Sequence, residues 1–306
     1  MIRDGWEETA ETGRSRKIPR PRSLRTWRVG TQVHELGRRS WIMGVLNVTP
    51  DSFSDGGRFL DPGRAIAHLI GMAEAGADII DIGAESTRPG SDPVPAEEQW
   101  RRIGPIIKEI SRESLPCRLS VDTSEPLVAG RALEAGVDII NDISSLRSHP
   151  ELGRMVAEAG AGLVLMHMRG TPKTMQQEPK YDDLFGEVRY FLNEAIRRAM
   201  DAGVDRERIV CDPGIGFGKR VEDNLDLISN IEELDSLERP ILIGASRKSF
   251  IGKILDLPSD ERLEGSLAAH VTAVLSGAHI IRAHDAIATI RAARLADAVL
   301  ERIRER

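Results

Sequence analysis

Cysteine, aromatic residues and long apolar runs are all scarce in this 306-residue sequence. The two cysteines, Cys117 and Cys211, are too few for a disulfide framework and form no Cys-x-x-Cys pair, which favours a reducing compartment. The longest uncharged stretch, 266–281, is shorter than the roughly 18 residues that a membrane-spanning helix needs. No apolar signal segment stands near the first residue. We therefore expect a soluble, cytoplasmic protein that does not contact the membrane.

An excess of positive charge is also missing, because 42 Lys and Arg stand against 48 Asp and Glu. Residues 1–40 hold ten basic and five acidic side chains, which leaves a net charge of −11 on the other 266 residues. Nucleic-acid binding needs a basic face, so we expect no nucleic-acid partner. Residues 1–40 are interpreted as a basic N-terminal extension, partly mobile, with a possible hairpin between Thr26 and Trp41.

Apolar residues make up 41% of the sequence, enough for a sizeable core. They occur in a repeated unit: a helical stretch, a glycine stop, a short β-branched run and then a polar residue. The glycine stops are Gly76, Gly136, Gly160, Gly203 and Gly277. Glycine just past a helix adopts the left-handed conformation without strain. The runs that follow do not alternate with polar residues, which is typical of parallel strands buried on both faces.

Eight such runs are predicted to be strands, at 42–48, 78–83, 118–122, 138–141, 163–167, 209–212, 241–244 and 279–282. Predicted helices between them include 62–75, 97–112, 126–135 and 184–202. Strict strand–helix alternation in one chain predicts an α/β fold, a single-domain (β/α)8 TIM barrel over residues 41–306. An open doubly wound sheet would show a glycine-rich first turn and two halves, and neither is evident.

Polar residues stand at every predicted strand end, which is where barrels of this type carry their chemistry. They are Asn47, Glu85 with Arg88, Asp122, Asn141, His167, Asp212, Arg247 with Lys248, and Arg282 with His284. One half of this set, Asp122, Asn141, Asp212 and Lys248, suits a flat, nitrogen-rich heterocycle, since a carboxylate accepts two N–H bonds from an aminopyrimidine edge. The other half, Asn47, Arg88, Arg282 and His284, suits phosphate oxygens with Mg²⁺ beside them.

Two long loops after the first two strands, 49–57 and 85–93, are rich in Gly, Pro and Ser and are interpreted as lids that exclude water. The glycine-rich segment 214–219 matches neither the dinucleotide fingerprint nor the P-loop. His167 and His284 lack the spacing of zinc ligands. Ser86, Ser246 and Ser249 lack a Gly-x-Ser-x-Gly elbow, so a hydrolase is not expected.

Eight co-linear segments resemble the dihydropteroate synthase family, over roughly 85% of the chain from Ile42 onward. They are MGVLNVTPDSFSDGG at 43–57, ESTRPG at 85–90, SVDT at 120–123, IND at 140–142, MHMRGTP at 166–172, DPGIGFGK at 212–219, SRKSF at 246–250 and RAHD at 282–285. The resemblance implies a transferase of folate biosynthesis. Such an enzyme joins 6-hydroxymethyl-7,8-dihydropterin pyrophosphate to p-aminobenzoate, releasing pyrophosphate and 7,8-dihydropteroate.

The resemblance also implies residue roles. The pterin would be held by Asp122, Asn141, Met166, Asp212, Phe217 and Lys248. The pyrophosphate would contact Asn47, Thr87, Arg88, Arg282 and His284, with Mg²⁺ on Asn47 and Asp55. The p-aminobenzoate slot, where sulfonamides compete, would be formed by Phe53, Pro89, Lys248 and Ser249. Catalysis would fall to Asp122, Asp212, Lys248, Arg282 and His284, and the family typically forms a homodimer through its late helices.

We interpret the reaction as a dissociative substitution, in which the C–O bond breaks before the arylamine attacks and the two aspartates stabilise the pterin cation. One alternative is a pterin-binding methyltransferase that uses methyltetrahydrofolate, which has no need of a pyrophosphate cluster. A second alternative is a catalytically silent pterin-binding paralogue, which would be expected to lack Lys248, an arginine or the loops; this sequence retains them all.

Overall fold

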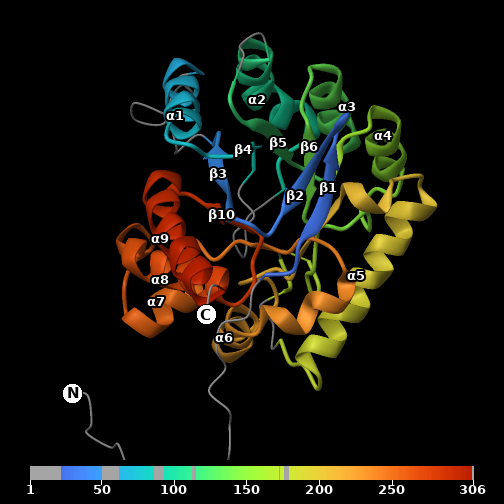
Figure 1. Ribbon diagram of the computed structural model, residues 1–306. Coiled ribbons are helices and arrows are strands. Elements are labelled where there is room, and N and C mark those ends of the chain that lie inside the picture. Colours follow the sequence, from blue (N-terminus) through green and yellow to red (C-terminus); the bar gives the residue numbers. More distant parts are fainter. Residues whose placement is uncertain are drawn as a thin grey trace, which may run out of the picture.

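The computed structural model describes residues 22–49, 62–85, 93–111, 115–171, 173–175 and 179–304. Its central feature is a sheet of eight parallel strands surrounded by helices (Figure 1). The strands run in the order β8-β7-β6-β5-β4-β3-β10-β9. A parallel bridge between Cys211 and Ile241 links β8 to β9 and brings the two edges together. The predicted TIM barrel is confirmed.

The barrel strands are β3 Trp41–Asn47, β4 Ile79–Gly83, β5 Arg118–Asp122, β6 Ile139–Asp142, β7 Gly162–Met166, β8 Ile209–Asp212, β9 Leu242–Ile243 and β10 Ile280–Ala283. Each predicted strand is therefore confirmed to within one residue at both ends. The helices are α1 Pro62–Glu74, α2 Ala96–Ile110, α3 Pro126–Glu134, α4 Glu151–Ala159, α5 Leu184–Asp201, α6 Val221–Ser229, α7 Ser249–Leu255, α8 Leu263–Leu275 and α9 Ala286–Arg304. Short 3-10 helices are η1 Arg206–Arg208, η2 Ile231–Leu237 and η3 Ser259–Glu261.

The predicted glycine stops are confirmed as well, because all five have positive φ: Gly76, Gly136, Gly160, Gly203 and Gly277. Each lets the chain turn from a helix into the next buried strand. Within the described residues, no helix combines the length and apolar character needed to cross a bilayer.

Inside the barrel, side chains from successive strands form an apolar layer near the strand N-termini. Its members are Met43, Ile79, Ile139, Val164, Val210, Leu242 and Ile280, all fully buried. Because strand side chains alternate in direction, the residues two positions farther along also face inward. On four strands these are Asp81, Asn141, Asp212 and Arg282. A polar layer therefore lies directly above an apolar one, toward the end where the strands finish.

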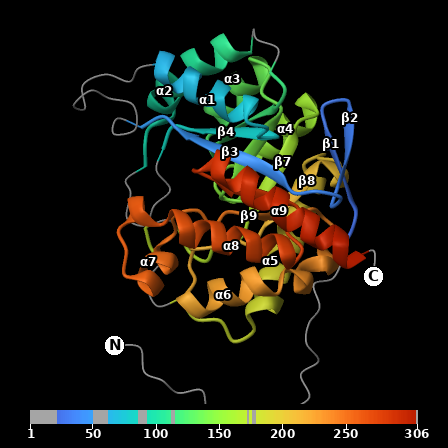
Figure 2. The ribbon, with the colours of Figure 1, turned by 60° about the vertical axis from the view of Figure 1, so that its left-hand side comes forward.

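An antiparallel hairpin closes the apolar end of the barrel. It consists of β1 Arg25–Val29 and β2 Gln32–Leu36 and lies across the strands in Figure 1. Figure 2 places it on the same side as the C-terminal end of α9. Trp27 packs in the apolar layer without solvent exposure, and its Nε1 donates to the backbone oxygen of Arg208 at 3.0 Å. The hairpin thus completes the core at this end.

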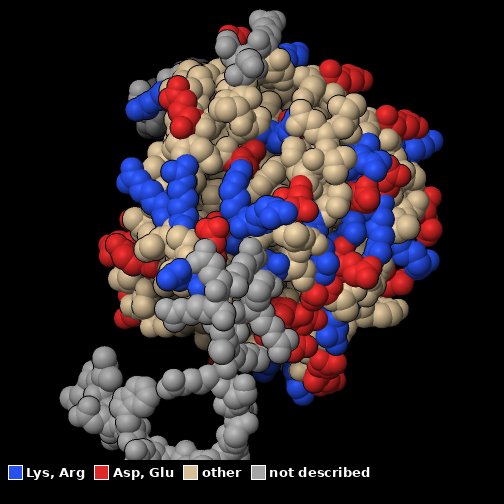
Figure 3. Space-filling model, in the orientation of Figure 1, with Lys and Arg blue, Asp and Glu red and all other residues tan. Residues whose placement is uncertain are grey.

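Basic and acidic side chains are intermingled on the face that carries the hairpin (Figure 3). Arg25 pairs with Asp235, Arg28 Nη2 lies 2.6 Å from Glu207 Oε2, and Arg39 Nη2 lies 2.6 Å from Asp78 Oδ1. The described part of the basic extension therefore has acidic partners on the barrel itself.

His279 ties the chain entering the hairpin to two barrel strands. Its Nδ1 accepts from the backbone N–H of Ile241 at 3.1 Å, and its Nε2 donates to the backbone oxygen of Ser23 at 2.9 Å. One ring nitrogen accepts and the other donates, which is the hydrogen-bonding pattern of a neutral imidazole. Burial lowers the pKa of His279 to about 4, with Arg22 and Arg25 adding to the effect.

This histidine should make the fold sensitive to acid. The unfolded chain binds a proton at His279 near pH 6.5, whereas the folded protein does so near pH 4, so the contribution to stability is present above pH 6.5 and is lost as the pH falls toward 4. Between pH 7 and 5, we expect the unfolding free energy of the wild type to fall by about 2 kcal/mol more than that of His279→Gln. Urea unfolding measures both, with the exposed His68→Gln as control. Equal pH slopes for His279→Gln and wild type would contradict the assignment.

Candidate active site

The polar ends of the strands meet in a cavity of about 340 Å³ at the mouth of the barrel. Its wall includes members of both halves of the predicted constellation, Asp122 and Lys248 from one and Asn47, Arg282 and His284 from the other, together with Phe217 and Ser249. These residues come from the ends of β3, β5 and β10 and from the segments after β8 and β9. The structure therefore brings the candidate heterocycle and phosphate groups into one site.

Arg282 connects the two halves. Its Nε donates to Asp81 Oδ2 and its Nη2 donates to Asp122 Oδ2, each at 2.7 Å. Burial alone would lower the pKa of Arg282, but Asp81 and Asp122 hold it above its ordinary value. The guanidinium that was expected to serve the phosphate thus also contacts a carboxylate of the pterin group.

Two opposing effects act on the pKa of Asp122. Burial raises the pKa of its carboxyl group, whereas Arg282 and Lys248 act to lower it. Ligand N–H groups that donate to the carboxylate would add to the second effect, because hydrogen bonds to the charged form favour ionisation. The site therefore suits a ligand with donors on its edge.

Asp81 was not among the predicted site residues. It lies in the middle of β4, is fully buried, and accepts hydrogen bonds from Ser120 Oγ at 2.6 Å and Asn141 Nδ2 at 2.9 Å as well as from Arg282. A signal existed in the sequence, since a carboxylate flanked by Ile80 and Ile82 in a buried strand requires donors from neighbouring strands.

Asp212 ends β8, and the glycine-rich segment that follows wraps around it. Asp212 Oδ1 accepts from the backbone N–H of Gly214 at 2.6 Å. Burial raises the pKa of Asp212, while the Gly214 hydrogen bond, Lys248 and Arg282 oppose that rise. Gly214 has φ +70°, and a Cβ there would lie 1.9 Å from the backbone oxygen of His167. Only glycine allows this close approach.

Lys219, a second residue that the prediction missed, closes the same segment. Its Nζ lies 2.9 Å from His167 Nδ1 and donates to the backbone oxygen of Phe217 at 3.1 Å. Burial lowers the pKa of Lys219 to about 7 and also lowers the pKa of His167. His167, predicted only as a polar strand end, is thus a buried partner of this lysine that helps to fix Phe217.

Lys248 lies over the face of Phe217, with its Nζ 4.0 Å from the ring centroid. The preceding residue, Arg247, has φ +56°, a conformation uncommon for a non-glycine residue. Arg247 is held there by Asp285, which accepts from its Nε at 2.9 Å and its Nη2 at 2.6 Å. The backbone N–H of Arg247 also donates to Ser266 Oγ at 2.9 Å. These contacts fix the turn from which Lys248 extends.

His284 contributes a neutral imidazole rather than a charge. Its Nδ1 lies 3.0 Å from Ser246 Oγ. Burial lowers the pKa of His284 to about 3, and the cations Arg282 and Lys248 lower it further. At physiological pH, hydrogen bonding is therefore what His284 offers to an anion.

Three predicted pterin residues are almost fully buried: Asn141, Met166 and Asp212 are 4%, 3% and 7% exposed. Met166 packs with Met168, Met175 and Phe217, and Met175 itself lines the cavity. Asn141, Met166 and Asp212 themselves are not in the wall of this cavity, whereas Met175 and Phe217 are.

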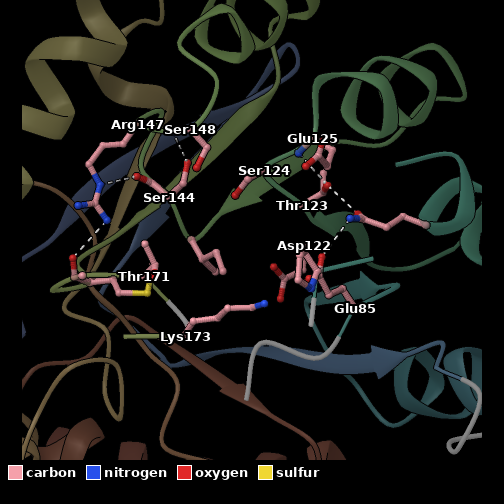
Figure 4. A pocket seen from close by; sticks show the side chains of 15 residues that line it. Glu85, Asp122, Thr123, Ser124, Glu125, Ser144, Arg147, Ser148, Thr171 and Lys173 are labelled. Atoms are coloured by element: carbon pink, nitrogen blue, oxygen red, sulfur yellow. Dashed lines mark hydrogen bonds between the residues drawn. The ribbon is translucent and has the colours of Figure 1, made fainter. Parts of the chain in front are cut away.

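A second cavity of about 530 Å³ adjoins the first and shares Glu85 and Asp122 with it (Figure 4). Hydroxyl-bearing residues from the loops after β5 and β6 line much of it, and Lys173 points from the opposite wall toward Asp122. Glu85 accepts from Gln99 Nε2 at 3.0 Å and from the backbone N–H of Val94. Its burial raises the pKa of this carboxyl group. Glu85 therefore connects the mouth to the start of α2.

Five predicted site residues lie outside the described residues: Phe53, Asp55, Thr87, Arg88 and Pro89. Both predicted lid loops fall largely in the same ranges.

Residues 43–284 match the family described as "Pterin binding enzyme". The dihydropteroate synthase of Escherichia coli K12 is 47% identical over 259 residues, covering 85% of this chain and 91% of the relative. A Yersinia pestis dihydropteroate synthase, solved with a sulfonamide drug complex, is 40% identical with a TM-score of 0.83, covering 90% of this chain and 99% of that one. A Burkholderia cenocepacia dihydropteroate synthase complexed with 7,8-dihydropteroate is 39% identical with a TM-score of 0.82, covering 93% and 100%. This chain belongs to the dihydropteroate synthase family of pterin-binding enzymes.

Proposed function

We propose that this chain is a transferase of folate biosynthesis that joins 6-hydroxymethyl-7,8-dihydropterin pyrophosphate to p-aminobenzoate. The observation that carries the proposal is the single cavity in which Asp122 and Lys248 adjoin Asn47, Arg282 and His284. A heterocycle with a diphosphate leaving group needs both kinds of contact at once. The relatives described above support the same reaction.

In this proposal the pterin ring is held by acceptors and a cation below the cavity mouth. Asp122, Asn141 and Asp212 accept N–H donors from its edge, and Lys248 contacts its ring. Met166 and Phe217 provide the apolar surfaces against which a flat ring packs. Because Asp212 is fixed by Gly214, the carboxylate is already oriented before a ligand arrives.

The pyrophosphate leaves toward Arg282, His284 and Lys248. Mg²⁺ would supply additional charge neutralisation on the phosphate oxygens when it is bound. Asn47 provides an amide oxygen on the wall of the cavity, and the family resemblance adds Asp55 as a second ligand. Among the described residues, no three His, Cys, Asp or Glu side chains form a metal-binding group. The two protein oxygens that Asn47 and Asp55 would supply fit an ion whose other ligands are phosphate oxygens and water.

The reaction is a dissociative substitution at the hydroxymethyl carbon. The C–O bond breaks first, its electron pair leaves with pyrophosphate, and Asp122 and Asp212 stabilise the resulting pterin cation. The amine nitrogen of p-aminobenzoate then forms the new C–N bond and releases a proton to solvent or pyrophosphate. Lys248 and Ser249 border the aminobenzoate slot, which the family resemblance completes with Phe53 and Pro89 and in which sulfonamides would compete.

A methyltransferase that uses methyltetrahydrofolate would need the pterin contacts alone. Asn47, Arg282 and His284 at the same cavity favour the synthase instead. Neither a methyltransferase nor a silent paralogue would release pyrophosphate when p-aminobenzoate is added, so an assay of pyrophosphate release with and without p-aminobenzoate distinguishes the synthase from both alternatives.

We further propose a homodimer and a cytoplasmic location. Large apolar side chains are exposed on the late helices: Ile254, Leu255, Ile287, Leu295 and Val299. Leu295 is 70% exposed, and a second copy packed on α9 would remove it from water. A reducing compartment suits the free thiols of Cys117 and Cys211.

Replacing Asp212 by Asn tests the cation-stabilising role. We expect kcat to fall about 100-fold or more, because the amide cannot offer the negative charge, while the thermal unfolding temperature changes little. Pyrophosphate release measures kcat, and the exposed Asp201→Asn is the control. Wild-type turnover in Asp212→Asn would show that this carboxylate does not stabilise the transition state.

Removing Mg²⁺ tests the metal proposal. We expect a chelator to suppress pyrophosphate release and added Mg²⁺ to restore it. Asn47→Ala should raise the Mg²⁺ concentration needed for half-maximal activity roughly tenfold or more, because an oxygen ligand is lost. An unchanged Mg²⁺ requirement in that variant would remove Asn47 from the metal site.

The dimer proposal predicts that Leu295→Glu produces a monomer in light scattering coupled to size-exclusion chromatography. A charge at the centre of an apolar interface would be buried without a partner. Tyr190→Glu on α5, where the side chain is 71% exposed, is the matched control and should leave the mass unchanged. A wild-type protein that is already monomeric would refute the dimer.

A further inference from the structure

Asp81 is a buried charged residue of the barrel to which the mechanism above assigns no task. Its side chain has no solvent exposure, so it does not contact a ligand in the cavity. It nevertheless binds residues from three other strands: Ser120 on β5, Asn141 on β6 and Arg282 on β10. Two of these three are residues of the proposed substrate site.

The first consequence concerns the amide of Asn141. A carboxylate only accepts hydrogen bonds, so the Asn141 nitrogen, and not its oxygen, faces Asp81, at 2.9 Å. Since Asn141 is 4% exposed, its amide has little freedom to rotate. Asp81 therefore decides which end of this amide is available as an acceptor.

The second consequence concerns the guanidinium of Arg282. Its Nε is held by Asp81 and its Nη2 by Asp122, so one planar group spans two carboxylates. Without the charge of Asp81, the fork of the guanidinium would be free to pair with both oxygens of Asp122. That pairing would occupy the carboxylate that a ligand N–H needs.

We propose that Asp81 is a positioning residue that determines which heterocycle the pocket accepts. It keeps the Asn141 oxygen available as an acceptor and limits Arg282 to one of the two oxygens of Asp122. Both effects favour a ring whose edge carries an amino group over the same ring without it. The inference rests on the proposed function, whose pterin site it describes in more detail.

Asp142 provides a matched control. It is the next residue after Asn141, is also fully buried, and also accepts several hydrogen bonds, from Ser124 Oγ at 2.6 Å, Ser144 N at 2.8 Å and Leu146 N at 2.6 Å. Asp142→Asn thus removes a buried strand-end carboxylate with a different set of partners. It should lower stability without changing ligand discrimination.

The experiment compares two probes by calorimetry, 6-hydroxymethylpterin and its 2-deamino analogue. We expect the wild type to prefer the amino form and Asp81→Asn to lose about tenfold or more of that preference. Asp142→Asn should keep the wild-type ratio. The exchange Asp81→Asn with Asn141→Asp should recover most of the preference, because the amide at 81 would donate to a carboxylate at 141 that still offers an acceptor.

The possible results distinguish failure of the proposed function from failure of the role of Asp81. A wild type that does not bind 6-hydroxymethylpterin overturns the proposed function and this inference with it. A wild type that discriminates, together with a folded Asp81→Asn that discriminates equally well, overturns the role of Asp81 alone. If Asp81→Asn does not fold, the exchange variant decides: a recovered ratio supports the proposal, and a lost ratio in a folded exchange variant contradicts it.

Discussion

A guanidinium shared by two buried carboxylates is the interaction on which the rest of the active end depends. Arg282 comes from the last strand of the barrel, and Asp81 and Asp122 come from strands far earlier in the chain. A buried charge is tolerated when it is paired and hydrogen-bonded, and removal of one partner leaves the others uncompensated. The strands must therefore lie in their observed register for these three groups to be stable at all.

This constraint divides the barrel into two layers with different tasks. Near the strand N-termini, side chains such as Ile79 and Ile280 pack around Trp27 and supply hydrophobic stabilisation. Asp81 and Arg282 stand at the next inward-facing position along the same two strands. Burying the polar layer is unfavourable unless its groups form hydrogen bonds and ion pairs with one another. The free energy of folding must therefore come mainly from the apolar layer and the hairpin that covers it.

The fold could be predicted from the sequence because its signals are local. A glycine stop such as Gly136, followed by an apolar run, identifies a strand without knowledge of its neighbours. The residues at strand ends could be predicted for the same reason. The burial of Asp81 could be predicted from its apolar strand, but its role could not, because its partners Ser120, Asn141 and Arg282 are neighbours only after the barrel closes. Lys219 shows the same limit, since its partner His167 belongs to another strand.

Because Arg282 bridges the two halves of the site, binding of the heterocycle and binding of the diphosphate would depend on each other. A heterocycle that donates N–H groups to Asp122 competes with the guanidinium for that carboxylate. A diphosphate beside His284 and Asn47 would attract the same guanidinium, which lines the same cavity. Each part of the ligand therefore weakens the ion pair that opposes binding of the other part. Two groups that favour the same displacement of one residue bind cooperatively when they are joined, which gives a pterin diphosphate an advantage over pterin and diphosphate separately.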